Sequence, residues 1–501
     1  MATPITASML YNFIQCPHRV ELDLFGNPSE KDEVSVFIQL LWEKGNSFEQ
    51  QVIENIKIPF TNLKPFWGAE KERLTLEAMQ RGDPLIYSAR ICSGNLLGEP
   101  DLLRRKDAGY VAIDIKSGAG EENAGDKAYK KPKKHYGVQL ALYTEILEHL
   151  GFLTERTAFV WDVHGDEISY ELETPLGERN PQSMWDFYQE VLTQVQTIIS
   201  KEIQTTPANS AMCKLCVWRR KCLKILTQEK DLTLIPELGR SKRDLLVQKI
   251  KNIPELAQTD LADFSKGKKT VFPGIGLATL EKYQTRARLQ MQPNAQPYLT
   301  EPHNLPEARR EIFFDIETDP MRDVCYLHGF YERQNQDNRT EKYVAFFADN
   351  PGPEQERIAF AEAWRYVQAS QPCMIYYYSK YERTIWRNLQ EKYPDIASPE
   401  EIEAMFSPER SIDLYFDVVR AKTEWPTKDY SIKTLAVFLG FRWRDKDPSG
   451  ASSIEWYHRW VESHDQSIKQ RILDYNEDDC IATRILLDGI RRLQIKNYPE
   501  N

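Results

Sequence analysis

Acidic residues in the last third of the chain have spacings that suit metal-dependent hydrolysis. Asp315 and Glu317 are one residue apart in an apolar, strand-like run, so a strand would point both carboxylates to one face. Tyr475 and Asp479 are four residues apart, on one face of a helix, and Glu382 follows a second apolar run. Together these acids could bind two divalent ions about 4 Å apart and activate water, which the tyrosine would orient. Taken singly, each element could instead be a solvated acidic turn.

A second set of polar residues lies in the first third of the chain. Asp101 follows a proline, and Asp114 and Lys116 are one residue apart in the next strand-like segment. Two carboxylates there can hold Mg²⁺ or Mn²⁺, and a lysine beside them can orient water or stabilise phosphate charge. Gln139 and Tyr143 share a face of the following helix, from which the amide could contact nucleic acid and the phenol could position the metal site. On its own, a charged pair at a strand edge is more often simply solvated.

Three cysteines, Cys213, Cys216 and Cys222, lie within ten residues of one another. In a chain with eight cysteines among 501 residues, this spacing indicates metal ligands rather than a disulfide. A four-ligand site needs one more thiolate, for which Cys16 is the candidate. A metal there would connect both ends of the first domain and contribute to its folding. The spacing leaves zinc and an iron–sulfur cluster both open, and simple burial is an alternative for Cys216 or Cys222.

The elements that carry these residues alternate between short apolar strands and longer helices. This alternation indicates α/β architecture in the first and last thirds of the chain. Strand signals cover residues 97–103 and 110–115, and a helix is expected over 136–149. Further strands are expected over 311–315 and 373–378.

The segment 229–300 has a helical pattern with two turn signals, each with an apolar residue, a proline and a glycine ahead of a helix. Gly239 and Gly276 permit tight turns, and exposed amides at helix N-termini can bind phosphate oxygens. The segment resembles tandem helix-hairpin-helix motifs, which hold the DNA backbone without reading its sequence. An ordinary helical connector is the alternative. A proline-bearing linker over 292–306 separates this segment from the last third.

Length and composition limit the class of protein. At about 150 residues per domain, 501 residues predict about three domains, which we expect at 1–228, 229–300 and 308–501. A hydrophobic share of 41% excludes wholesale disorder. Because no apolar run approaches the ~18 residues of a membrane span and no signal peptide is evident, a cytoplasmic protein without membrane contact is expected. The net charge of -10 argues against a protein that coats DNA, but it suits a metal-dependent nuclease with clustered acids.

The motifs of the first part follow a recognisable order. They are Cys16, Pro100-Asp101, Asp114-x-Lys116, Gln139-x3-Tyr143 and a C-x2-C-x5-C motif. This order resembles the RecB-like PD-(D/E)xK nuclease domains with an iron–sulfur cluster, a group that includes the CRISPR adaptation nucleases. The resemblance implies a restriction-endonuclease-like fold and a structural 4Fe–4S cluster on the four cysteines, with zinc as the alternative.

One departure from that pattern concerns the helix ahead of the strands. RecB-like domains usually place a histidine metal ligand there, directly before a glutamate. This chain has Phe48 at that position, and phenylalanine cannot bind a metal. Glu49 follows it and is the remaining candidate metal ligand on that helix.

The last part, over residues 308–490, resembles DEDD exonucleases of the RNase H-like fold. Asp315 and Glu317 match the first acidic motif, and Tyr475 with Asp479 matches the last motif of the tyrosine-bearing subclass. The second motif normally holds an aspartate, and Glu382 matches it with an acid that is one methylene longer, as in the domains of this kind attached to RecB-like nucleases. The resemblance implies 3′–5′ exonuclease activity with Mg²⁺ or Mn²⁺ at these acids.

Three more polar residues lie near the matched motifs. Asp413 and Lys433 are expected as neighbours of the acidic site. Asp478 is adjacent to Asp479, but on a helix it points off the metal-facing side.

The whole chain resembles the bacterial family of RecB-like nucleases with a C-terminal RNase H-like exonuclease domain. We expect a two-site, metal-dependent DNA nuclease that acts on single strands or duplex ends in repair, recombination or defence. Because no P-loop motif is present, any unwinding motor would be a separate helicase. Two alternatives stay open. One is a 3′–5′ exoribonuclease, because the acidic chemistry does not distinguish sugars. The other is a DNA-binding scaffold whose first site has decayed at Phe48.

Overall fold

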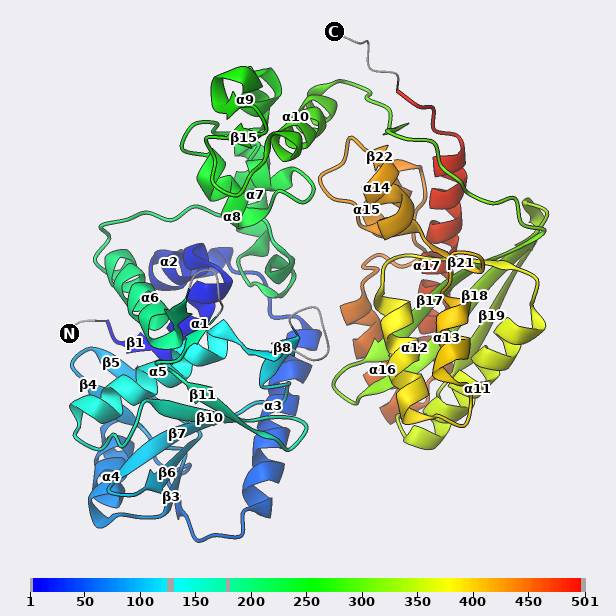
Figure 1. Ribbon diagram of the computed structural model, residues 1–501. Helices are drawn as coiled ribbons and strands as arrows, with labels where there is room; N and C mark the ends of the chain where they lie inside the picture. The colour runs from blue at the N-terminus through cyan, green and yellow to red at the C-terminus, as the bar shows by residue number, and fades with distance from the viewer. Residues whose placement is uncertain (1–2, 124–129, 177–180, 497–501) are drawn as a thin grey trace. The chain divides into compact units, whose positions relative to one another are not determined.

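The computed structural model describes residues 3–123, 130–176 and 181–496 (Figure 1). The chain divides into two compact units. The first consists of Met1–Pro207 and Ala211–Cys222, and the second of Ala208–Ser210 and Leu223–Asn501. Each unit has its own central β-sheet with helices packed against it. The α/β class predicted from the sequence is confirmed.

The first unit is built on a mixed six-stranded sheet in the order β11-β10-β7-β6-β3-β2. The central strand β7 pairs with β10 in parallel and with β6 antiparallel. The strands are β2 Thr61–Asn62, β3 Leu85–Tyr87, β6 Leu102–Lys106, β7 Gly109–Ile115, β10 Thr157–Trp161 and β11 Glu167–Glu171. Shorter strands outside this sheet are β1 Ile5–Thr6, β4 Ile91–Ser93, β5 Leu96–Gly98, β8 Glu121–Asn123, β9 Lys130–Pro132, β12 Pro175–Leu176 and β13 Gln182–Ser183.

Both faces of this sheet are apolar and covered. Leu103, Ala112 and Val160 lie on one face, in a core that also includes residues of α1, α5 and α6. Leu102 and Ile113 lie on the other face and pack against α3. Buried strands that are apolar on both faces are typical of sheets enclosed by helices. The helices are α1 Ala7–Gln15, α2 Pro17–Phe25, α3 Val36–Asn55, α4 Gly68–Arg81, α5 Lys134–His149 and α6 Met184–Ile199.

Two of the three elements predicted for this unit are confirmed. The helix expected over 136–149 is α5, and the strand expected over 110–115 is β7. The single strand expected over 97–103 is wrong, because β5 and β6 are separate strands. Pro100, which cannot donate a backbone hydrogen bond to a ladder, interrupts them. Asp101 therefore lies in the turn ahead of β6 rather than within a strand.

The second unit contains a five-stranded sheet in the order β19-β18-β17-β20-β21. β17, β18 and β19 pair antiparallel, whereas β20 and β21 run parallel to β17. The carboxyl ends of β17, β20 and β21 therefore meet at one edge of the sheet. The strands are β17 Arg310–Asp319, β18 Val324–Gln334, β19 Asp337–Phe347, β20 Met374–Tyr377 and β21 Ser411–Asp413. The strands predicted over 311–315 and 373–378 are confirmed as β17 and β20.

Helices cover both faces of this sheet as well. Ile312 and Phe314 of β17 pack in a core with α11 and α12, while Phe313 packs on the other face with α17. Because side chains alternate along a strand, Asp315 and Glu317 share the α17 face with Phe313. The helices are α11 Pro353–Ala369, α12 Tyr381–Lys392, α13 Pro399–Met405, α14 Arg420–Lys422, α15 Ile432–Phe438, α16 Gly450–Ser463 and α17 Gln466–Arg491, with a π-helix over Leu414–Val419.

The middle segment folds as a helical part of the second unit. Its helices are α7 Arg219–Glu229, α8 Gly239–Leu246, α9 Ile253–Gln258 and α10 Leu277–Met291, and they share one apolar core. Short strands also occur, namely β14 Ser265–Lys266, β15 Lys269–Thr270, β16 Tyr298–Leu299 and β22 Thr423–Glu424. β16 pairs antiparallel with β22, which ties the end of the linker to the last part of the chain.

A buried arginine fixes the middle segment to the rest of the second unit. The Arg286 side chain on α10 is fully buried, and its Nε donates to Glu424 Oε2 at 2.8 Å. Its Nη1 donates to the carbonyl of Pro236 at 2.8 Å and to Glu237 Oε2 at 3.0 Å. Tyr430 donates to the same Glu424 oxygen at 2.6 Å. Breaking one partner of such a buried pair is strongly destabilising, so these helices and the second sheet are coupled in stability.

The cations expected to bind phosphate at α8 have internal partners. Lys242 Nζ donates to the hydroxyl of Tyr283 at 2.6 Å. Arg243 is 3% exposed, and its Nε lies 3.1 Å from Asp244 Oδ1. Gly239 has a φ of +64°, as a tight turn requires. The expectation for Gly276 is wrong, because its φ is -74° and the positive φ of the second turn, +74°, lies at Gly274. The helix-hairpin-helix interpretation therefore stays a prediction, with fewer exposed cations than the sequence suggests.

Among the described residues, no helix combines the length and the apolar character that a membrane span requires.

Candidate functional site

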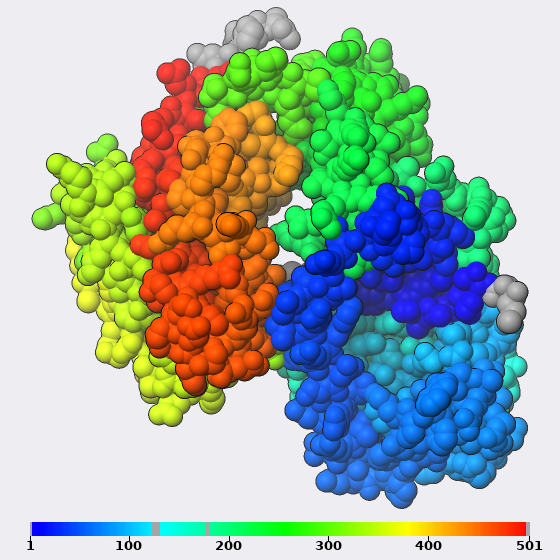
Figure 2. Space-filling view, turned by 180° about the vertical axis from the view of Figure 1, so that it is seen from behind, coloured from blue at the N-terminus to red at the C-terminus, as the bar shows by residue number. Residues whose placement is uncertain are grey.

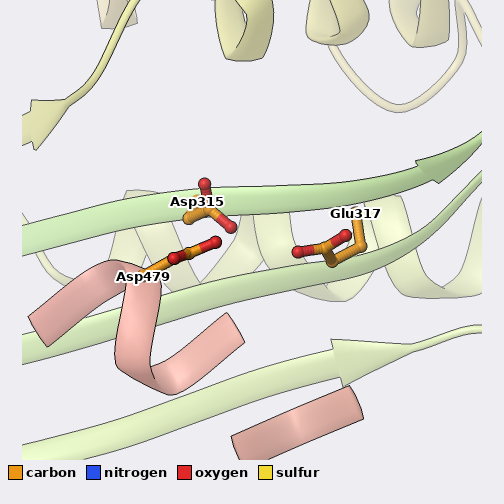
Figure 3. A group of neighbouring side chains, drawn as sticks. All are labelled: Asp315, Glu317 and Asp479. Carbon is orange, nitrogen blue, oxygen red and sulfur yellow. The ribbon is translucent and has the colours of Figure 1, made fainter. Parts of the chain in front are cut away.

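Three carboxylates from two elements of the second unit converge. Asp315 and Glu317 on β17 face α17, which carries Asp479. One carboxylate oxygen from each residue lies within 4.8 Å of the others, and Figure 3 shows the three side chains pointing toward one another. Within residues 3–123, 130–176 and 181–496, no other group of histidine, cysteine or acidic ligand atoms is this close. Because Mg²⁺ and Mn²⁺ prefer oxygen ligands, these three acids fit a divalent metal centre.

A backbone irregularity in β17 lies directly after Glu317, near the end of the strand. The register with β18 shifts between Glu317 and Thr318, which is a β-bulge. Bulges re-aim side chains and are common beside active sites. Glu317 and Asp479 are only 6% and 8% exposed, so both acids are held in a largely desolvated space.

A buried amide orients the Asp315 carboxylate. Asn476 Nδ2 donates to Asp315 Oδ2 at 2.7 Å, and Asn476 Oδ1 accepts from the hydroxyl of Tyr343 at 2.7 Å. The second bond fixes which end of the amide faces Asp315. Gly329 leaves the room for it, since a Cβ at that position would lie 1.6 Å from Asn476 Oδ1. Three residues on three elements, Asn476 on α17, Tyr343 on β19 and Gly329 on β18, thus hold one carboxylate in place.

The other two acids also have fixed donors. Trp443 Nε1 donates to Asp479 Oδ1 at 2.7 Å. The hydroxyl of Tyr326 lies 2.8 Å from Ser453 Oγ and 3.5 Å from Glu317 Oε2. Each bond to a carboxylate restricts its rotation, which is how surrounding groups orient metal ligands.

The surroundings of the three acids favour their protonated forms. Burial raises the pKa of Glu317 to about 8, and the nearby Asp479 carboxylate adds to this. Burial, with the charges of Asp479 and Glu317, raises the pKa of Asp315 well above its usual range. Burial also raises the pKa of Asp479, against the opposing effect of Lys433. A divalent cation would displace these protons, because it supplies the positive charge that the buried acids lack.

We expect the metal-free protein to lose stability as the pH rises. Between the ordinary pKa of 4.5 and the folded value of about 8, the unfolded chain has released the Glu317 proton and the folded chain retains it. The unfolded state then binds fewer protons, so the free energy of unfolding falls with rising pH. Glu317→Gln should weaken this dependence and raise the unfolding temperature near the upper limit of that range. Thermal unfolding of the wild type and of Glu317→Gln in EDTA across this range measures the pH dependence and the unfolding temperature. Equal pH dependence in the two proteins would show that Glu317 does not cause the loss of stability.

Tyr475 is held beside Asp479 on α17. Its hydroxyl donates to the Asp479 carboxylate and accepts from Lys433 Nζ at 2.8 Å. Lys433 also donates to the carbonyl of Pro448, which fixes the ammonium group. Burial raises the pKa of Tyr475 well above its usual range, so the phenol keeps its proton. One lone pair of the hydroxyl oxygen is left to accept a hydrogen bond from water.

Glu382 lies close to the three acids without joining their group. It sits in the first turn of α12 and is 4% exposed. Burial and the carboxylates of Asp413 and Asp479 raise its pKa well above the usual range. Among the described residues, its Oε2 has no hydrogen-bond partner. A buried oxygen without a donor is costly unless a cation or water binds it, so Glu382 fits a fourth ligand.

Asp413 is a neighbour of Glu382, as expected, and it also fixes the backbone ahead of that residue. Its Oδ1 accepts backbone amides from Ser379, Tyr415 and Phe416 at 3.0, 2.9 and 3.1 Å. Ser379 has a φ of +96°, which is strained for a residue with a side chain. Because Ser379 stands three residues before Glu382, Asp413 fixes the turn that sets the start of α12.

Removal of the Asn476 amide should weaken the metal centre. We expect Asn476→Ala to lower Mn²⁺ affinity or kcat by about 10- to 100-fold, as for other partners that orient metal ligands. Calorimetric titration with Mn²⁺ measures the first quantity and single-strand hydrolysis the second. Tyr343→Phe keeps the amide and should lose less. Wild-type Mn²⁺ affinity and kcat in folded Asn476→Ala would show that the amide does not position Asp315.

The second set of predicted residues meets at the end of β7 in the first unit. Lys116 Nζ lies 2.7 Å from Asp114 Oδ2, and the Ile115 amide donates to Asp101 Oδ2 at 2.7 Å. Burial, followed by the Asp114 charge, raises the pKa of Asp101 to about 7. Burial favours the neutral amine of Lys116, but the Asp114 and Asp101 carboxylates outweigh it and raise its pKa. The site therefore holds two buried acids and one charged lysine.

Helix α5 brings the two predicted polar residues to this site. Burial raises the pKa of Tyr143 well above its usual range, and the charges of Asp114 and Asp101 contribute. A Cβ at Gly98 would lie 2.7 Å from Tyr143 Cδ1, so the glycine lets the ring approach. Gln139 is 9% exposed, and within the described part of the chain its Oε1 has no hydrogen-bond partner. That amide oxygen is available to a metal-bound water or a substrate donor.

Helix α3 contributes less to this site than the resemblance implies. Glu49 Oε1 accepts from Lys64 Nζ and from the hydroxyl of Tyr87, each at 2.7 Å. The glutamate is thus neutralised by a lysine. Phe48 is partly buried and packs against the apolar sheet face together with Val52 and Ile53.

The four predicted cysteines come from separate segments of the first unit. Cys16 stands between α1 and α2. Cys213 lies within a short 3₁₀ helix, Ala211–Leu215, Cys216 directly follows it, and Cys222 lies on α7. Burial raises the pKa of Cys222 to about 12, and the sulfurs of Cys216, Cys16 and Cys213 add to this, which places the four within electrostatic reach. None of the eight cysteines forms a disulfide. Among the described residues, no three of these sulfurs lie within 4.8 Å of one another.

Three residues that contact the acids of the second unit are not predicted by the sequence patterns. Asn476 stands three residues before Asp479, so helical spacing could identify it. Trp443 and Tyr326 come from a loop and from a neighbouring strand, and only the tertiary fold brings them to the site.

The comparisons with known proteins agree with these two sites. Residues 31–223 match the PD-(D/E)XK nuclease superfamily, and residues 312–490 match the RNase_H superfamily. A search of curated sequences found no match. The first match includes Asp101, Asp114 and Lys116 but not Cys16, and the second includes all four acids of the second unit. The chain therefore joins a PD-(D/E)XK nuclease domain to an RNase H superfamily domain.

Proposed function

We propose that this protein is a metal-dependent DNA nuclease whose C-terminal site removes nucleotides from 3′ ends. The observation that carries the proposal is the convergence of Asp315, Glu317 and Asp479 within 4.8 Å. Glu382 lies nearby with an unpartnered oxygen, and Tyr475 stands four residues before Asp479, as in the tyrosine-bearing DEDD exonucleases.

The residues divide the work of hydrolysis. Divalent ions bound by the four acids would polarise a phosphoryl oxygen and make water a better nucleophile. The Tyr475 hydroxyl donates to Asp479 and accepts from Lys433, so its remaining lone pair can hold the attacking water by one hydrogen. Asn476 and Trp443 hold Asp315 and Asp479 in place. The product of attack at a 3′-terminal phosphodiester is a nucleoside 5′-monophosphate.

The first unit is proposed as a second nuclease site. Asp101 and Asp114 would bind Mg²⁺ or Mn²⁺, Lys116 would stabilise phosphate charge, and Gln139 and Tyr143 would complete the site. Because Glu49 is paired with Lys64, we expect weaker metal binding here than at the C-terminal acids. The alternative function, a DNA-binding scaffold, is supported by this site, because Phe48 replaces a metal ligand and Glu49 is paired with Lys64.

The four cysteines are proposed to hold a structural 4Fe–4S cluster. The choice of a cluster over zinc rests on the resemblance of the motif order to RecB-like domains. Free thiols and a cluster both suit a reducing compartment, so a cytoplasmic location is part of the proposal.

DNA is proposed as the substrate because of the pairing with a RecB-like domain, and the middle helices are proposed to contact its backbone. Repair, recombination or defence is the proposed setting. The proposed function does not include a helicase partner, because no contact among the described residues supports one.

Product analysis tests the proposal. Anaerobically purified protein is incubated with Mn²⁺ and single-stranded DNA or RNA, and released mononucleotides are identified. We expect nucleoside 5′-monophosphates from DNA and none in EDTA. Products from RNA alone would replace the proposal with an exoribonuclease. Binding without any product would favour the scaffold.

A further inference from the structure

The carboxyl edge of the second sheet carries exposed or half-buried aromatic and cationic side chains next to the acids. Tyr381, Lys380 and Arg420 are exposed, and Phe416 and Lys282 are half-buried. β17, β20 and β21 are parallel neighbours, so the residues that follow them form a row along this edge. The row begins at Thr318, continues through the turn before Glu382, and reaches Phe416 in the π-helix after β21.

The row starts with the ring of Tyr381, which links the residues next to Glu317 and Glu382. Tyr381 is 48% exposed, and its hydroxyl lies 2.5 Å from Thr318 Oγ1. Thr318 directly follows Glu317, and Tyr381 directly precedes Glu382. A large exposed ring at this position can stack on a base whose phosphate enters the metal centre.

The row continues with a ring between two cations. Lys380 Nζ lies 4.5 Å from the centre of the Phe416 ring, and the Arg420 guanidinium lies 5.6 Å from it. Lys380 and Arg420 are both exposed. The Phe416 amide is bound to Asp413, so the ring is anchored at its backbone.

The row ends on the middle segment. Lys282 on α10 donates to the carbonyl of Arg420 at 3.4 Å, while Arg420 pairs with Glu237 at 2.5 Å. Figure 2 shows the orange segment around α14 and α15 next to the green segment that includes α10. From the acids outward, two rings alternate with two cations, and the third cation, Lys282, ends the row.

We propose that Tyr381, Lys380, Phe416, Arg420 and Lys282 form a track for a single nucleic-acid strand that leads its 3′ end to the acids. Alternating rings and cations match the alternating bases and phosphates of such a strand. The inference deepens the proposed function and rests on it for the direction of the strand. Strand binding itself does not require catalysis.

Binding in EDTA tests the track without hydrolysis. The full-length protein is titrated with a fluorescent oligothymidylate of about 15 nucleotides, the length scale of one single-strand site. We expect Phe416→Ala to raise Kd about tenfold, which lies within the range for the loss of one stacked base. Lys380→Ala should reduce the slope of log affinity against log salt by about 0.7, for one phosphate contact.

Matched variants make the test specific. Phe416→Trp keeps a stacking ring and should bind like the wild type. Lys342→Ala removes an exposed lysine from β19, away from the track, and should leave both Kd and the salt slope unchanged. Unchanged Kd in Phe416→Ala together with an unchanged slope in Lys380→Ala would overturn the track. Strand binding that depends on the track, without hydrolysis in Mn²⁺, would overturn the proposed function and leave the track standing.

Discussion

Asp315→Asn should abolish release of mononucleotides from single-stranded DNA, with a loss of about 10³-fold or more in kcat/KM. Metal ions contribute several kcal/mol to such reactions, and each 1.36 kcal/mol is a factor of ten in rate. Asn476 donates a hydrogen bond to Asp315, and the charges of Glu317 and Asp479 raise the pKa of the same carboxyl group. The amide removes the charge that holds a cation and keeps the shape of the side chain.

The variant should remain folded, because burial already disfavours the charge that is removed. Unfolding temperature is therefore expected to stay equal or to rise in EDTA. Asp478→Asn is the matched control, since Asp478 neighbours Asp479 but is paired with Arg444 at 2.9 Å. We expect that control to keep near wild-type activity. Equal losses in the two variants would show that general acidity of α17, and not the metal centre, supports hydrolysis.

Cys16→Ser should remove the proposed cluster and destabilise the first unit. The cluster would close a ~200-residue loop between Cys16 and Cys213, and in the chain-entropy model closing a loop of that size contributes roughly 5 kcal/mol. For a unit of this size, such a loss lowers the unfolding temperature by about 10 °C or more. Iron content, visible absorbance and calorimetry of anaerobically purified protein measure both effects.

Cys92→Ser provides the control, because Cys92 lies on β4 and is not one of the four. It should retain iron and absorbance. The second sheet has its own cores, so the unfolding transition of the second unit should move less than that of the first unit in Cys16→Ser. Stoichiometric zinc in the wild type would correct the metal, and unchanged stability on loss of Cys16 would contradict a structural site.

Periodicity explains why much of the fold could be predicted from the sequence. The apolar runs that became β7, β17 and β20 and the helical pattern of α5 are local signals. Pro100 shows where such reasoning fails, because a single residue without an amide hydrogen divides one expected strand into two. The attachment of the middle helices through Arg286 depends on partners far away in sequence and has no local signal.

The candidate sites show the same division. Spacings of two residues on a strand and four on a helix place the residues of each motif on one face. The resemblance to DEDD exonucleases is what predicts that Asp315, Glu317 and Asp479 meet. The ion pair of Glu49 has no such local signal, because its partner Lys64 lies in a separate segment. Trp443 likewise reaches Asp479 from a loop. These contacts depend on tertiary packing, and they decide how strongly each site can hold a metal.

The most direct test of the central claim follows a single strand of DNA labelled at its 5′ end during incubation with Mn²⁺. The wild type and Lys116→Ala, which disables the first site, are compared with Asp315→Asn. The account predicts a ladder that shortens progressively from the 3′ end in the first two proteins and an intact strand in the third. A ladder that persists in Asp315→Asn and disappears in Lys116→Ala would contradict it and assign the nuclease activity to the first unit.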